Sequence, residues 1–288
     1  MLAAVVVVVF SVSPSPVSSV PHISERPAAE KAQPHSTGSA RICDTANFRV
    51  ESHSLRCDAR TVADRCESLR KHLQLKWLGA ESSETWSARC IVVVHARRET
   101  YQAAIGRGGE QTFGSSIVKF QGDRPSDRRI DLLVDRAGTL SALGHELTHM
   151  VIADAFPGSQ PPAWANEGAA VLADSVAKQQ LHKRDLDQSF RSRTFFHCAE
   201  LMQMADYPSA DRVPAFYGQS ASLASFLVTI GGSEKFVPFL KQASDHGYDH
   251  ALQESYGIRG MAELQHRWNG HHSATNAWPR LAAAEPRF

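Results

Sequence analysis

The residues with the clearest chemistry are two histidines four positions apart, with a glutamate directly after the first. They lie in the segment Gly144-His145-Glu146-Leu147-Thr148-His149-Met150. On a helix, positions four apart lie one above the other at about 5 to 6 Å between Cβ atoms, so both imidazole rings can reach one metal ion. Zinc is the favoured metal, because neutral imidazole is a good zinc ligand and a catalytic zinc site keeps one position open for water. We therefore predict His145 and His149 as zinc ligands and Glu146 as the base that acts on water.

This motif needs a helix with one face for the core and another for the metal. Residues 140–156 predict such a helix, because Gly144 is its only internal glycine or proline and Pro157-Gly158 ends the run. At about 100° per residue, three leucines and Val151 fall in one sector and the two histidines fall opposite. Further apolar residues on the histidine side indicate a helix buried between two layers. A second element must therefore cover the histidines.

A second predicted helix, from Ala163 to Asp174, can supply that cover. It follows the stiff, proline-containing connector 157–162 and contains Glu167, which lies 18 positions after His149. This separation lets an antiparallel helix return a carboxylate to the same metal, and His-His-Glu is a known catalytic zinc set. Small residues after Glu167 allow the two helices to approach closely. We therefore predict Glu167 as the third zinc ligand.

The sequence H-E-L-T-H-M followed by P-P-x-W-x-N-E-G-x-A resembles the gluzincin-type zinc metallopeptidases, most closely the bacterial peptidase MA-like group, with thermolysin a more distant relative. The resemblance spans roughly residues 45–270, and its firm motifs lie between His145 and Ala170. It implies the ligand set and base named above. It also implies a hydrogen-bond donor to the developing oxyanion. We predict this role for Tyr217, because an apolar helical run begins at Phe216 and the resembling group often has a tyrosine at the start of this helix; an aromatic anchor in the core is the alternative. Thermolysin-like enzymes carry an acidic residue four positions after the third ligand. This chain has Val171 there, and Asp174 is the nearest substitute on that face.

The order of the predicted elements indicates an α+β, zincin-like fold, in which a small mixed sheet packs on the motif helix and a mainly helical half follows. Strands are predicted at 90–95, 114–120 and 129–134. The last of these ends just before the motif helix. We therefore expect it to form the rim of the cleft, where an extended peptide could add itself by main-chain hydrogen bonds.

Residues 1–40 are predicted to lie outside this domain. Leu2 to Phe10 is a short apolar block with the length of a signal-peptide core and too short to span a bilayer, although no Lys or Arg precedes it; a buried strand is the alternative. The Ser-, Pro- and Ala-rich residues 11–40 are typical of a flexible linker. We predict a catalytic domain over 41–272, a flexible tail over 273–288, no stable membrane span, and a secreted, periplasmic or cell-envelope location.

Cysteine content and charge add two expectations. Five cysteines fit an exported protein with some disulfide bonds, and the odd number leaves one thiol over. A Cys57–Cys66 bridge with a Cys43–Cys90 bridge is one of three possible pairings, and Cys198 would then be the free thiol. The net charge of +1 gives no support for a nucleic-acid partner.

Together these residues predict a secreted zinc metalloprotease that hydrolyses peptides or proteins. Glu146 would take a proton from the attacking water and return it to the leaving amine. Two alternatives use the same zinc site: a non-catalytic zinc-containing binding or scaffold domain of the cell envelope, and a zinc hydrolase of a non-peptide amide or ester. Glu146 argues against the scaffold, because a domain that only binds has no need of a base.

Overall fold

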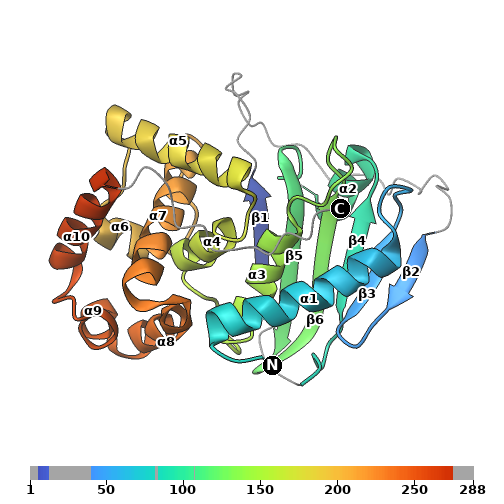
Figure 1. Cartoon of the computed structure of the whole chain (residues 1–288), viewed down its shortest axis with the longest axis horizontal. Helices are drawn as coiled ribbons and strands as arrows, with labels where there is room; N and C mark the ends of the chain where they lie inside the picture. The colour runs from blue at the N-terminus through green and yellow to red at the C-terminus, as the bar shows by residue number, and fades with distance from the viewer. Residues whose placement is uncertain (1–5, 13–39, 82–83, 107, 275–288) are drawn as a thin grey trace, which may run out of the picture.

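The computed structural model describes residues 6–12, 40–81, 84–106 and 108–274. Within these residues, six strands form one mixed sheet, and most of the helices lie beside it in the C-terminal half (Figure 1). The strand order in the sheet is β1-β5-β6-β4-β3-β2. The strands are β1 (Val6–Val12), β2 (Arg41–Asp44), β3 (Phe48–Ser52), β4 (Cys90–His95), β5 (Thr112–Gln121) and β6 (Arg124–Leu133). The predicted α+β, zincin-like class is confirmed.

The centre of the sheet is parallel and its two ends are antiparallel. β4 pairs parallel with both β3 and β6, whereas β5 runs antiparallel to β6. Side chains alternate between the two faces of a strand. Arg128 of β6 donates to the carbonyl oxygen of Met150 and pairs with Asp154, so Ile130 and Leu132 lie on the same face as Arg128, toward the motif helix. The sheet therefore anchors the helix that carries the histidines.

Strand β6 has a partner strand on each side, so the expectation that residues 129–134 form the rim of the cleft is wrong. The strand that contacts Glu146 is β5, which pairs with β1 on its other side. β6 lies inside the sheet between β5 and β4. Its last four residues are all buried, as expected for an internal strand covered on both faces. Chain order suggested β6 because it directly precedes the motif helix, but the β5–β6 hairpin places β5 further out.

The helices divide into those on the sheet and those of the C-terminal half. α1 (Ala59–Leu78) crosses in front of the sheet beside α3 (Leu143–Ala153), which is the motif helix (Figure 1). α2 (Arg98–Ile105) follows β4. The C-terminal half contains α4 (Ala163–Val171), α5 (Val176–Ser192), α6 (Cys198–Gln203), α7 (Val213–Gly231), η1 (Ser233–Lys235), α8 (Phe236–His246), α9 (Tyr248–Tyr256) and α10 (Met261–Ala274). Helix α3 is shorter than predicted, because residues 140–142 and 154–156 form turns at its two ends.

Helix α7 is the central helix of the C-terminal half. Its residues from Ala215 to Val228 are all buried. In the part of the chain that the structure describes, it is the one helix long and apolar enough to cross a membrane by length and composition, and 78% of its most apolar window is buried inside the protein. That burial is typical of the core helix of a globular protein.

Residues 6–10 of the apolar N-terminal block belong to β1, which runs antiparallel along β5 from the Val6–Lys119 pair to the Val12–Thr112 pair. The described part of the block is therefore a strand, and both the signal segment and the export of the protein stay predictions. The predicted linker lies outside the described residues from 13 to 39. The predicted tail lies outside them from 275 onward.

All five cysteines are buried free thiols, so the structure contains none of the predicted disulfide bonds. Cys66 and Cys90 lie close enough to interact electrostatically. Cys57 lies elsewhere, with its Sγ 3.6 Å from the carbonyl oxygen of Gly138. Burial raises the pKa of the Cys198 thiol to about 12, which keeps this residue unreactive at neutral pH.

Candidate active site

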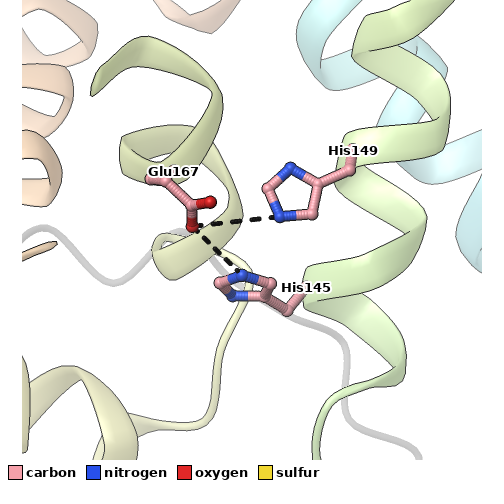
Figure 2. A group of neighbouring side chains, drawn as sticks. All are labelled: His145, His149 and Glu167. Atoms are coloured by element: carbon pink, nitrogen blue, oxygen red, sulfur yellow. Dashed lines mark ion pairs between the residues drawn. The ribbon is translucent and has the colours of Figure 1, made fainter. Parts of the chain in front are cut away.

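Three predicted zinc ligands come together between α3 and α4. Figure 2 shows His145 and His149 projecting from α3 toward Glu167 on α4. Oε2 of Glu167 lies 3.5 Å from Nε2 of His145 and 3.9 Å from Nε2 of His149. One potential ligand atom from each residue lies within 4.8 Å of the other two. These three residues could therefore hold one metal ion.

The donor atoms themselves fit a metal. Nε2 of His145, Nε2 of His149 and Oε2 of Glu167 are buried, and none has a hydrogen-bond partner among the described residues. Buried polar atoms without partners are costly and rare. Three such atoms converging on one point, from two imidazoles and a carboxylate, match a catalytic zinc site.

Two glycines let the helices around the site approach closely. A Cβ on Gly168, next to Glu167, would lie 2.4 Å from the carbonyl oxygen of Ser220 in α7. A Cβ on Gly144, next to His145, would lie 3.0 Å from the carbonyl oxygen of Ala173. The small residues beside the motif residues therefore set the separation between α3, α4 and α7.

Asp174 contacts the ring of His145 on the side away from the predicted metal position. Its Oδ2 lies 3.0 Å from Nδ1 of His145, and its Oδ1 accepts a hydrogen bond of 3.0 Å from Nζ of Lys178. An Nδ1–H bonded to a carboxylate leaves Nε2 free for a metal, which is the usual arrangement behind a histidine ligand. The substitute expected from the sequence thus contacts the first ligand, while Val171 is buried in the core.

The two histidines have opposite pKa shifts. Burial alone would lower the pKa of His145, but the negative charge of Asp174, the hydrogen bond to Asp174 and the nearby carboxylate of Glu167 outweigh it and raise the pKa to about 9. Burial dominates at His149 and lowers its pKa to about 4. Burial opposes ionisation of Asp174 as well, yet Lys178 and His145 hold its pKa at about 2. In the metal-free protein His149 is therefore a neutral ligand, whereas His145 must lose a proton before it binds a metal.

Glu146 lies beside the histidines with its carboxylate held by β5. Its Oε2 accepts a hydrogen bond of 2.6 Å from Oγ of Ser116, and a Cβ on Gly114 would lie 2.5 Å from its Oε1. The side chain is fully buried. Burial raises its pKa to about 7, against the opposing effects of His145 and Ser116. A carboxylate with a pKa near neutral is well suited to exchange protons with water.

The tyrosine in contact with the site is Tyr207, which the sequence analysis did not identify. Its hydroxyl donates a 2.5 Å hydrogen bond to Oε1 of Glu167. Tyr217 is buried behind it, with ring centroids 6.5 Å apart, and stacks on His182 at 5.6 Å. Burial and the charge of Glu167 raise the pKa of Tyr207, so its hydroxyl stays protonated and remains a donor. The oxyanion role of Tyr217 stays a prediction.

Comparison with known proteins indicates the family. Residues 136–274, which include the three predicted ligands, Glu146 and both tyrosines, match the family model of the peptidase MA superfamily. This segment is similar to the peptidase MA superfamily, which agrees with the resemblance to gluzincins and supports a member of that superfamily. No curated protein matches the chain in sequence. The superfamily supports a hydrolase of the metallopeptidase type that acts on peptides or proteins.

Proposed function

We propose that this protein is a zinc-dependent peptidase in which His145, His149 and Glu167 hold the ion. The observation that carries the proposal is the convergence of three buried donor atoms that have no hydrogen-bond partner in the described residues. A zinc ion, when bound, supplies Lewis-acid activation of water and of a carbonyl group.

Glu146 performs the proton transfers in this proposal. Its Oε2 is held by Ser116, while Oε1 has no hydrogen-bond partner among the described residues. Oε1 is therefore the atom that takes a proton from the attacking water and passes it to the leaving amine. With its pKa at about 7, the carboxylate is an adequate base in one step and an adequate acid in the next.

The edge of β5 is the proposed docking surface for the peptide. Gly114 and Ser116 bring the main chain of β5 directly against Glu146. An extended peptide that pairs with this edge would place its scissile bond within reach of Glu146. In the structure β1 occupies this edge. A substrate that pairs with β5 must therefore displace residues 6–12, or it must bind to a form of the enzyme from which these residues have been removed. Export of the protein, proposed from its apolar N-terminus, would provide such a chain.

The test is hydrolysis of a broad peptide library by the zinc-loaded protein and its Glu146→Gln variant. The substitution keeps the shape of the side chain and removes its basicity. We expect unchanged zinc content and a rate lower by about 10²- to 10⁴-fold. Glu254→Gln, on the exposed face of α9, is the matched control and should cleave like the wild type.

Other outcomes would support other functions. Equal hydrolysis by the wild type and Glu146→Gln would refute the proposed mechanism. A wild-type protein that binds zinc but cleaves neither peptides nor model esters and amides would support the scaffold function. Products released only from non-peptide substrates would support the third alternative.

A further inference from the structure

The two carboxylate oxygens of Glu167 have different surroundings. Oε1 accepts the hydrogen bond from the hydroxyl of Tyr207 at 2.5 Å. Oε2 faces the two histidines and has no hydrogen-bond partner in the described part of the chain. The carboxylate is fully buried, so water does not compensate for a missing partner. Oε1 is therefore occupied by a hydrogen bond, and Oε2 points at the predicted metal position.

Tyr207 reaches Glu167 from a connecting segment and not from a helix of the site. It lies between α6 and α7, and its ring packs edge-on against Phe216 at a centroid distance of 5.4 Å. The residue is 43% exposed, although its hydroxyl contacts a fully buried carboxylate. Packing on Phe216 involves only the ring. The ring contact and the hydroxyl contact can therefore be tested separately.

We propose that Tyr207 is the positioning residue of the third ligand: its hydroxyl binds Oε1 of Glu167 and leaves Oε2 as the single oxygen directed at the metal. A carboxylate can offer a metal one oxygen or both. Hydrogen bonds from neighbouring groups to ligating carboxylates fix such choices and affect metal affinity. The proposal rests on the zinc site proposed above and adds to it the residue that sets the coordination by Glu167.

The first test is zinc affinity, measured by competition with a chromophoric chelator. Tyr207→Phe keeps the ring on Phe216 and removes the hydroxyl. We expect its zinc affinity to fall by about 10- to 100-fold. Tyr256→Phe is the matched control, because it removes a buried hydroxyl that has no hydrogen-bond partner in the described residues and lies on α9. It should bind zinc like the wild type.

Two further measurements separate positioning from a packing role. In a Glu167→Ala background, adding Tyr207→Phe should leave zinc affinity unchanged, because the hydroxyl acts only through the carboxylate. In cobalt-substituted protein, Tyr207→Phe should weaken the visible absorption, since a second carboxylate oxygen raises the coordination number.

The proposal is overturned if Tyr207→Phe binds zinc as tightly as the wild type, or if its effect on zinc affinity persists without Glu167. These outcomes differ from failure of the zinc site itself. In that case the wild type would bind no zinc stoichiometrically, or His145→Ala would bind it equally well.

Discussion

Replacing Asp174 by asparagine tests how the protein prepares its first histidine for a metal. Asparagine has the shape of aspartate, and its one amide oxygen can still accept a hydrogen bond from Nδ1 of His145, while the hydrogen bond from Lys178 to the other position is lost. The negative charge is lost. That charge is the main influence that raises the pKa of His145 against the effect of burial. Without it, burial dominates and His145 becomes neutral at pH 7.

The size of the effect follows from the pKa. In the metal-free wild type, the pKa of His145 is raised from 6.5 to about 9. The corresponding stabilisation of roughly 3 kcal/mol is fully present below pH 6.5 and is lost as the pH rises through about 9. Zinc must displace this proton, so wild-type affinity should increase about tenfold per pH unit between pH 7 and pH 9. In Asp174→Asn the increase should be much shallower.

The assay is zinc affinity by chelator competition at several pH values, with unfolding of the metal-free protein followed in parallel. At pH 9, where the proton no longer competes, Asp174→Asn should bind zinc about 10- to 100-fold more weakly, because the imidazole has lost the carboxylate behind it. Asp245→Asn, on the exposed side of α8, is the matched control. Equal pH slopes for Asp174→Asn and the wild type, or equal affinities at pH 9, would refute the assigned role of Asp174.

Three further predictions concern the base, the helix contacts and the sheet edge. Ser116→Ala removes a hydrogen bond that lowers the pKa of Glu146, so the acid limb of the pH–rate profile should move to higher pH; an unmoved limb would contradict the assignment of the base. Gly168→Ala would place a Cβ 2.4 Å from the carbonyl oxygen of Ser220 and should lower the free energy of unfolding by about 1 to 3 kcal/mol in urea titration. Removal of residues 1–39 uncovers the edge of β5, so kcat/KM for extended peptides should rise; an unchanged value would show that β1 does not compete with the substrate.

The parts of the site that follow from helix geometry could be predicted from the sequence. The separation of His145 and His149 by four positions fixes both rings on one face of any helix. The length of chain to Glu167 allows a second helix to return, and the structure brings the three donor groups together. The small residues after Glu167, beginning with Gly168, indicated close helix contacts, whereas the close approach of Gly144 to Ala173 appears only in the structure. Such inferences depend on local periodicity, which the sequence carries.

Features that depend on the path of the chain in three dimensions could not be predicted. Tyr207 precedes a proline in a connecting segment, which indicates a turn and gives no sign of the carboxylate 40 positions away. The prediction that residues 129–134 form the rim was wrong, because a strand that lies close to the motif helix in sequence need not lie at an edge of the sheet. Tyr217 was the residue that the sequence favoured for the site, because it lies at the start of an apolar helix. In the structure its ring stacks on His182, and the hydroxyl that contacts Glu167 belongs to Tyr207.

The position of Asp174 shows where helix periodicity stops being sufficient. Helix α4 ends at Val171, so Asp174 lies in a turn and not two helical turns after Glu167 on a continuous face. Its backbone carbonyl accepts a hydrogen bond from Gln179, and its carboxylate accepts one from Lys178. Both donors belong to the first turns of α5, whose N-cap is Ser175. The support behind His145 is therefore built by the junction of two helices. A change that loosens the start of α5 should weaken zinc binding without touching any of the three ligands.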